Sequence, residues 1–165
     1  MIHKCKCILP KLVGLGLIVA GICLAANGTA FGQGTKTVNA ALSNAHQPLY
    51  EAYRGVRIGM TAEEVRRKLG APTHIAGNQD LYMISDNETA QIAYDNSHQV
   101  ITISADYMGG VGAPDYKAVV GPDIETQADG SLYKIVWYKS AGFWVSYNRT
   151  AGTLPFVTVT IQKIK

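Results

Sequence analysis

The spacing of apolar residues changes from a helical to a strand period partway along the chain. In "TAEEVRRKL" (61–69), Val65 and Leu69 lie one turn apart among charged residues, which predicts a short amphipathic helix. Alternation with period two then follows in "DLYMIS" (80–85), "TAQIAYD" (89–95) and "VITISADY" (100–107). Short polar turns separate these three segments, so we expect a helix followed by an antiparallel β-meander.

The helix at 61–69 has clear signals at both ends. Thr61 is a preferred N-cap and Glu64 completes a capping box, while Gly70 is a preferred terminator. Eight residues are marginal as an isolated helix, so this one must pack on a sheet, with Arg66, Arg67 and Lys68 expected to face solvent. The residues that define the pattern are Gly59, Met60, Thr61, Glu64, Val65, Leu69, Gly70 and Pro72.

The second half of the chain repeats this order of elements. After a glycine-rich joint, "PDYKAVVG" (114–121) predicts another short helix, and 131–139, 142–148 and 156–164 predict three more strands. Glycines that end the two helices, Gly70 and Gly121, are 51 residues apart.

Two further matches support a repeat. "AYDN" (93–96) and "SYNR" (146–149) are 53 residues apart, and "ITIS" (101–104) and "VTVT" (157–160) are 56 apart. The offset grows at the turns, as in diverged repeats. The alternative is a chance likeness between two segments of similar composition.

We therefore predict an α+β fold in which short helices pack on one face of an antiparallel meander, the helix-plus-three-strand unit occurring twice, at 53–107 and 108–165. Alternation directs one set of strand residues to the helices and the other to the opposite face. The first set is Ile101, Ile103, Val157, Val159 and Ile161, and the second is Thr102, Ser104, Thr158, Thr160 and Gln162.

The N-terminus has the layout of a secretory signal peptide. Three lysines precede an uncharged run at 12–26, and small residues at 28–32 give a cleavage site after Ala30 or Gly32. We expect a cleaved leader at 1–32, the alternative being a retained anchor, and a flexible arm at 33–52 with a short helical turn near 46–53. Lipidation at Cys23 is not expected because Ile22, rather than a small residue, precedes it.

Composition excludes several classes of function for the chain after the leader. The full sequence has 15 Lys plus Arg against 12 Asp plus Glu, and three of the lysines lie before residue 33, which leaves a formally neutral chain. A neutral chain lacks the basic surface that nucleic-acid binding requires. All cysteines, Cys5, Cys7 and Cys23, are in the leader, so disulfides and thiolate chemistry are not expected beyond it.

No motif of a known catalytic or cofactor site is present. His46, His74 and His98 lack metal-ligand spacing, and "GGVG" (109–112) lacks the dinucleotide-binding pattern. We expect a protein that is not an enzyme and that uses no cofactor or metal.

The aromatic residues are concentrated near the C-terminus, where seven of fourteen lie between Tyr133 and Phe156. Alternation places large aromatics on both faces of the last strands, and one of those faces can form a protein-binding surface. The alternative is that Trp144 and Tyr138 pair across strands and only cover the sheet. The partner-binding residues predicted from this pattern are Lys134, Tyr138, Trp144, Ser146 and Thr158.

With its "IGMT" start (58–61), Val65 on the helix and "LGAP" end (69–72), followed by a meander, residues 53–107 resemble the SmpA/OmlA domain, the family of the outer-membrane assembly factor BamE. The tandem arrangement is similar to that of the β-lactamase inhibitory proteins, which grip an enzyme with an aromatic, concave sheet face. Those inhibitors carry disulfides, which this chain could not form after cleavage of the leader.

The resemblance implies an exported scaffold or binding protein of the cell envelope that contacts another protein. It implies a location in the periplasm or at the periplasmic face of the outer membrane, with at most peripheral membrane contact. The alternative that it implies is a secreted proteinaceous enzyme inhibitor.

Overall fold

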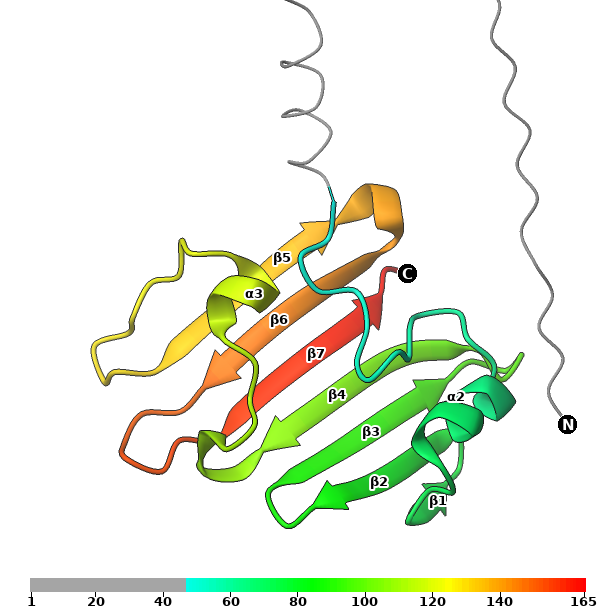
Figure 1. The fold of residues 1–165 in the computed structure, drawn as a ribbon. Helices are drawn as coiled ribbons and strands as arrows, with labels where there is room; N and C mark the ends of the chain where they lie inside the picture. Colours follow the sequence, from blue (N-terminus) through cyan, green and yellow to red (C-terminus); the bar gives the residue numbers. More distant parts are fainter. Residues whose placement is uncertain (1–46) are drawn as a thin grey trace, which may run out of the picture. The chain divides into compact units, whose positions relative to one another are not determined.

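The computed structural model describes residues 47–165, which form one antiparallel sheet with two short helices (Figure 1). The predicted leader at 1–32, its cleavage site and most of the predicted arm lie outside the described residues. The strands are β1 (His74–Ala76), β2 (Gln79–Ser85), β3 (Glu88–Tyr94), β4 (Val100–Tyr107), β5 (Leu132–Tyr138), β6 (Phe143–Arg149) and β7 (Val157–Lys163).

The strand order in the sheet is β1-β2-β3-β4-β7-β6-β5, with every neighbouring pair antiparallel. The last strand in sequence, β7, therefore lies in the middle, against β4 (Figure 1). Six strands were predicted at the right places. The three-residue edge strand β1 was missed, because its exposed "HIA" shows no alternation of buried and exposed residues.

The helix α2 (Ala62–Leu69) forms where its local signals predict it. Thr61 Oγ1 accepts a hydrogen bond from Glu64 N, and the Glu64 carboxylate accepts one from Thr61 N, which completes the capping box. Val65 is fully buried and Met60 packs against the same core. Gly70 then ends the helix at φ 86°, a conformation that favours glycine.

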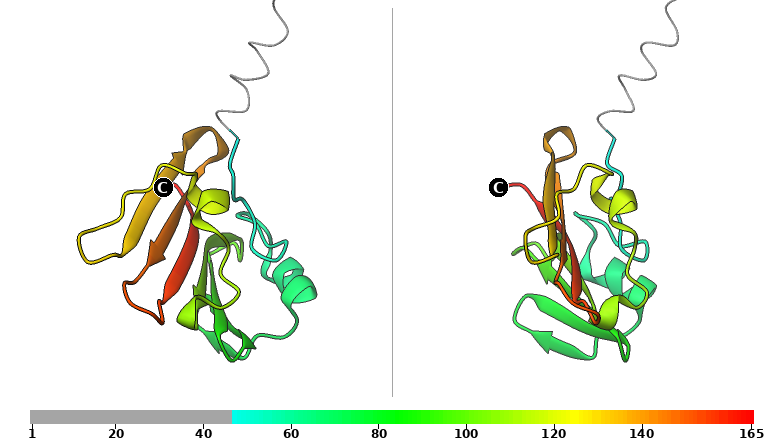
Figure 2. Two further views of the ribbon diagram at one scale, coloured as in Figure 1. Left: turned by 60° about the vertical axis from the view of Figure 1, so that its left-hand side comes forward. Right: turned by 90° about the vertical axis from the view of Figure 1, so that its left-hand side faces the viewer.

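Both α2 and the second helix, α3 (Tyr116–Val120), lie on one side of the sheet, which we call the helix face (Figure 2). An α+β fold with helices on one face is thus confirmed, while the helix-plus-three-strand repeat stays a prediction. Short 3₁₀ turns at Met108–Gly110 and Lys139–Ala141 connect neighbouring elements. Within residues 47–165 no helix has the length and apolar character needed to cross a membrane.

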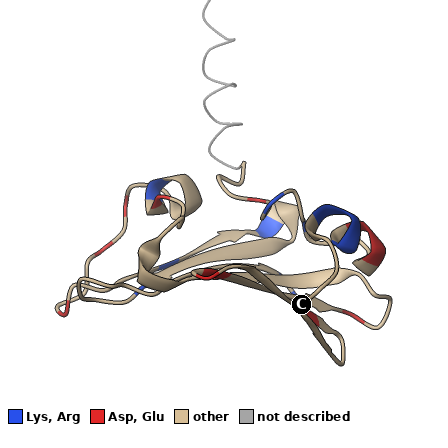
Figure 3. Cartoon of the chain, turned by 60° about the horizontal axis from the view of Figure 1, so that its bottom comes forward, with Lys and Arg blue, Asp and Glu red and all other residues tan. Residues whose placement is uncertain are grey.

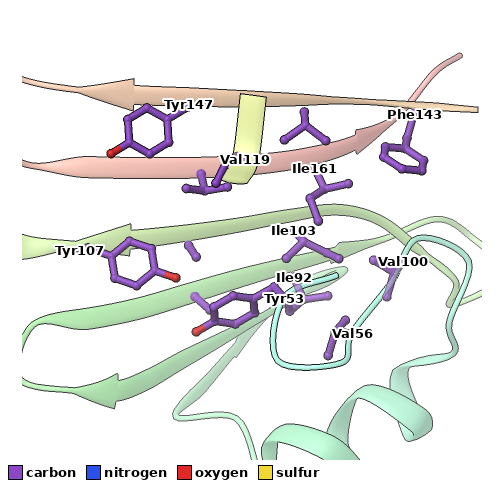
Figure 4. Packing of buried hydrophobic residues seen from close by; sticks show 14 of the residues in the cluster. Tyr53, Val56, Ile92, Val100, Ile103, Tyr107, Val119, Phe143, Tyr147 and Ile161 are labelled. Atoms are coloured by element: carbon purple, nitrogen blue, oxygen red, sulfur yellow. The ribbon is translucent and has the colours of Figure 1, made fainter. Parts of the chain in front are cut away.

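The core fills the space between the sheet and these covering elements. Ile92, Ile103 and Ile161 are at most 1% exposed and come from adjacent positions on β3, β4 and β7 (Figure 4). Val119 of α3 covers one part of this row, and Val56 covers another (Figure 4). A continuous apolar layer of this kind supplies the main stabilisation of the fold.

The segment 47–60 crosses the helix face as a third covering element, without the predicted helical turn in its described part. Its start is held at β5, where Leu49 N donates to Tyr138 Oη (3.3 Å). Its far end is held at β4, where Gly59 N donates to Val100 O (2.9 Å). The helix face thus needs fewer helical residues than a sheet of this width would otherwise require.

Two expectations about side-chain direction were wrong. Ile101 does not join Ile103 in the core, because the register between β3 and β4 shifts next to it and Val100 takes the buried position instead. Arg66 was expected to face solvent together with Arg67 and Lys68. Instead, its guanidinium forms two hydrogen bonds to the buried carboxylate of Asp80.

Candidate functional site: the open face of the sheet

The side of the sheet opposite the helices, here called the open face, carries a regular grid of side chains. Strand register aligns them in three rows that run from β2 to β5. The first row is Gln79, Ala93, Thr102, Gln162, Trp144 and Trp137; the second is Leu81, Gln91, Ser104, Thr160, Ser146 and Ile135; the third is Met83, Thr89, Asp106, Thr158, Asn148 and Tyr133.

One end of the open face is aromatic. Trp137 and Trp144 lie opposite each other on β5 and β6 with ring centroids 6.1 Å apart and planes inclined at 50°. Trp137 is 55% exposed and Tyr133, four residues before it, is 54% exposed. Ile135 lies between them on the same face. Large apolar side chains left this exposed on one patch are typical of a contact surface.

The middle of the open face is polar but almost uncharged. Ser104 Oγ and Thr160 Oγ1 are 3.2 Å apart, and Thr158 Oγ1 donates to Asp106 Oδ1 (2.7 Å). Asp106 is the single charged residue among the eighteen positions of the three rows. Hydroxyl and amide groups are therefore presented without strong electrostatic preference for one sign of charge.

Charges of the described residues instead hold the covering layer in place on the helix face. Arg66 Nε and Nη2 each lie 2.9 Å from an oxygen of Asp80, whose side chain is 1% exposed. Tyr94 Oη donates to the same carboxylate (2.9 Å). Burial alone would raise the pKa of Asp80, but the bonds from Arg66 and Tyr94 outweigh it and the pKa lies below its usual value. Burial raises the pKa of Tyr82, beside them, to about 12.

A second charged group fixes the segment 47–60. Arg54 Nε and Nη2 donate to the two oxygens of Glu88 (3.0 and 2.7 Å), and Tyr53 Oη donates to Glu88 Oε1 (2.7 Å). The hydrogen bonds from Arg54 are the main reason that the pKa of Glu88 is lowered, against the opposing effect of burial. These groups explain how the covering layer is attached, and their carboxylates are already fully engaged.

A polar hollow of about 440 Å³ lies between the start of α2 and the adjacent turns. Its lining includes Glu63, Arg66, Asn78, Tyr94 and His98. Within residues 47–165 no group of three or more His, Asp or Glu side chains is arranged to hold a metal ion. The hollow presents mixed polar groups, of which Arg66 and Tyr94 are already bonded to Asp80.

The structure divides the five predicted partner-binding residues between the two faces. Trp144, Ser146 and Thr158 lie on the open face, whereas Lys134 and Tyr138 lie on the helix face. Tyr138 packs against Phe143 (centroids 5.7 Å apart) and accepts the hydrogen bond from Leu49, so it anchors the covering segment. Trp144 lies opposite Trp137 rather than Tyr138.

The partner-binding residues predicted from the sequence did not include Tyr133, Ile135, Trp137 and Asp106, which also lie on the open face. The length of the connection 139–142 would have identified the three of them on β5. It is four residues long and sets Tyr138 opposite Phe143, which fixes the register between β5 and β6. In that register, odd-numbered residues of β5 lie opposite even-numbered residues of β6. Trp137 therefore lies opposite Trp144, on the same face.

No protein-family model, curated protein sequence or solved structure matches this chain.

Proposed function

We propose that this chain is an exported, non-enzymatic binding or scaffold protein of the cell envelope, of the SmpA/OmlA type, that contacts another protein through the open face. The observation that carries the proposal is the composition of that face: exposed indole and phenol rings beside a field of uncharged hydroxyl and amide groups, with Asp106 as its one charge.

This composition matches the chemistry of protein-binding surfaces. Rigid aromatic side chains supply contact area at low entropic cost, and Ser, Thr, Asn and Gln supply adaptable hydrogen bonds. Interface centres are also depleted of charged residues, as the grid is. An enzyme's site would instead need convergent titratable groups, and the open face has one carboxylate that is already bonded to Thr158.

The size of the open face suits such a role. Six strands spaced about 4.8 Å apart, with rows about 6.8 Å apart, span roughly 24 by 14 Å between outermost Cα positions. With side chains added, this gives on the order of 600 Å², somewhat below the ~800 Å² that each partner contributes to a standard interface. Adjoining loop residues can supply the remainder.

The predicted duplication is part of the proposal. Gly70 and Gly121 end their helices in nearly the same conformation, at φ 86° and 82°, and each N–H bonds the carbonyl four residues earlier. Sequence separations of 53 residues between β3 and β6, and of 56 residues between β4 and β7, match residues that lie on the same face of the sheet. The spacing of 51 between the two helix-ending glycines does not do so when it is applied to β2 and β5, since it matches Tyr82 of the helix face with Tyr133 of the open face.

Site-specific photo-crosslinking in the native host tests the function. A photoreactive residue at Gln91 or Asn148, on the open face, should crosslink to one envelope protein, whereas the same residue at Arg67, on the solvent side of α2, should not. Replacing Trp137 and Trp144 by Ala should lower the yield about tenfold or more, with exposed Leu154→Ala as the control. Equal yields from both sides, or recovery only from culture medium without an envelope partner, would overturn the proposal.

A secreted enzyme inhibitor is the second candidate function, and one observation favours it. The sheet is arched with the helices on its outer side, which leaves the open face on the hollow side where a convex enzyme surface fits (Figure 3). Titration of the purified chain against a panel of enzymes that includes β-lactamases should then reveal tight inhibition. An inhibition constant that Trp144→Ala leaves unchanged would exclude the open face as the inhibitory surface.

A further inference from the structure

The strand β5 forms one outer edge of the sheet, and most of that edge has no strand partner within residues 47–165. On its outer side only the start of β5 is engaged, through an isolated antiparallel bridge between Leu132 and Thr126 and a hydrogen bond from Gln127 N to Ser131 O (2.8 Å). The opposite edge is protected differently, because β1 is only three residues long. A seven-residue outer strand with unpaired backbone groups is a ready template for another strand.

The side chains of this edge strand have a near-symmetric pattern about Ile135. On the open face, Tyr133 and Trp137 flank Ile135 at equal distances. On the helix face, Lys134 is the single charged residue of β5 and Val136 is its counterpart on the other side of Ile135. A twofold axis through Ile135 would therefore place aromatic opposite aromatic and lysine opposite valine.

We propose that two copies of this chain associate through their β5 strands, antiparallel, with Ile135 of each copy on the twofold axis. In this register Tyr138 of the second copy takes the position opposite Leu132, so the bridge between Thr126 and Leu132 opens in the dimer. Tyr133 then pairs with Trp137 of the second copy, and both such pairs lie on the open face. Lys134 lies opposite Val136 of the second copy, so like charges are not placed directly opposite each other. The contact is isologous and closes, which gives a dimer rather than a filament.

This arrangement explains why the aromatic cluster lies at the edge of the open face. In one copy, Trp137 and Tyr133 are more than half exposed at the rim of the sheet. In the dimer, they join Trp144 and their equivalents in a single aromatic cluster at the centre of a face of double width. Residues that dominate binding energy are found near the centre of interfaces rather than at the rim.

The dimer is expected to be reversible. The four half-exposed rings bring roughly 400 Å² of surface to the junction, and strand pairing over five residues buries a similar area. The total buried area is therefore on the order of that of the smallest specific interfaces. We therefore expect a monomer–dimer equilibrium that shifts with protein concentration.

Engineered cysteines test both the dimer and its register. The full chain is used with Cys5, Cys7 and Cys23 replaced by Ser, which leaves no other thiol. Under mild oxidation, Ile135→Cys should form a covalent dimer, because directly opposite Cα atoms in an antiparallel pair are within disulfide range. Tyr133→Cys alone and Trp137→Cys alone should crosslink far less, whereas an equimolar mixture of the two should give the mixed dimer.

Sedimentation velocity gives an independent measure with no introduced disulfide. The unchanged chain should show a mass that rises toward that of a dimer with concentration, and Ile135→Lys should remain a monomer. Met83→Lys places the same exposed charge at the other end of the open face and should still dimerise. A monomer at all concentrations, or equal crosslinking at all three positions, would overturn the proposal. Because only purified chain is used, this outcome does not depend on the envelope partner.

Discussion

Ser104 Oγ and Thr160 Oγ1 lie 3.2 Å apart on the open face, directly opposite each other where β4 meets β7. The same two residues are the matched final positions of "ITIS" and "VTVT", 56 residues apart in sequence. Residues that match in the proposed repeat therefore meet at the middle of the sheet. Such a meeting is expected if two equivalent units join about a local twofold axis through this pair.

A double-mutant cycle tests whether the pair interacts as its distance indicates. Ser104→Ala and Thr160→Val each remove a hydroxyl group with little change of shape. We expect a coupling of about 0.5–1 kcal/mol in the free energy of unfolding, typical of a half-buried neutral hydrogen bond. Urea unfolding of the four proteins measures it. Strictly additive effects would mean that each hydroxyl bonds to water instead.

Asp80 is predicted to be the most sensitive charged position of the fold. Asp80→Ala leaves the guanidinium of Arg66 and the hydroxyl of Tyr94 without their acceptor beneath α2. We expect a loss of about 2 kcal/mol in the free energy of unfolding, less than for a fully buried pair, because the side chain of Arg66 is 41% exposed and water can solvate its charge. Asp86→Ala, in the exposed turn between β2 and β3, is the matched control and should cost less than about 0.5 kcal/mol. Similar losses for both variants would contradict this role of Asp80.

Stability is expected to fall in acid because of the same carboxylates. The pKa values of Asp80 and Glu88 are lower in the folded chain than in the unfolded chain, where they lie near 3.9 and 4.3. Their contribution is therefore complete above about pH 5 and is lost as pH falls through the folded pKa values. Urea unfolding between pH 7 and pH 2.5 should show this decline, with a shallower slope for Asp80→Asn. An identical slope would assign acid sensitivity to other groups.

Local structure was predictable from sequence, whereas pairing between distant residues was not. The capping box of Thr61 and Glu64 and the stop at Gly70 are encoded within ten residues, and each forms as predicted. The bond between Arg66 and Asp80 joins a helix to a strand, and no local pattern specifies it. Hydrophobic spacing correctly predicted that Val65 is buried. It could not show that, of the charged residues beside Val65, Arg66 bonds to a buried carboxylate.

The composition of the open face was predicted in part for a related reason. Strand alternation by itself separates Tyr133, Ile135 and Trp137 from Lys134 and Tyr138 within β5. Which of these sets shares a face with Trp144 depends on the register between β5 and β6. A shift of one residue in this register would bring the other set onto the face of Trp144, and the turn at 139–142 determines the register.

Two glycines provide a matched test of backbone conformation. Gly121 ends α3 at φ 82° and ψ 171°, a region open essentially to glycine alone, whereas Gly142 lies at φ 77° and ψ 18°, in the left-handed region that Asn tolerates. We expect Gly121→Asn to cost roughly 1–3 kcal/mol in the free energy of unfolding and Gly142→Asn less than about 1 kcal/mol. Thermal or urea unfolding distinguishes them. A larger cost at Gly142 would contradict backbone conformation as the deciding factor, because a Cβ at Gly142 meets no atom within 4 Å.

Glu88 is predicted to control local opening of the segment 47–60. Its carboxylate accepts hydrogen bonds from Arg54 and Tyr53, which join this segment to β3. In Glu88→Gln the amide cannot accept two bonds from Arg54 with both terminal atoms, so the segment should open more often while the sheet stays folded. Hydrogen exchange should rise at the amides of Tyr53 and Val56, which bond to each other's carbonyls, and stay unchanged at Ile103. Faster exchange at Ile103 as well would mean that this segment and the sheet unfold as one unit.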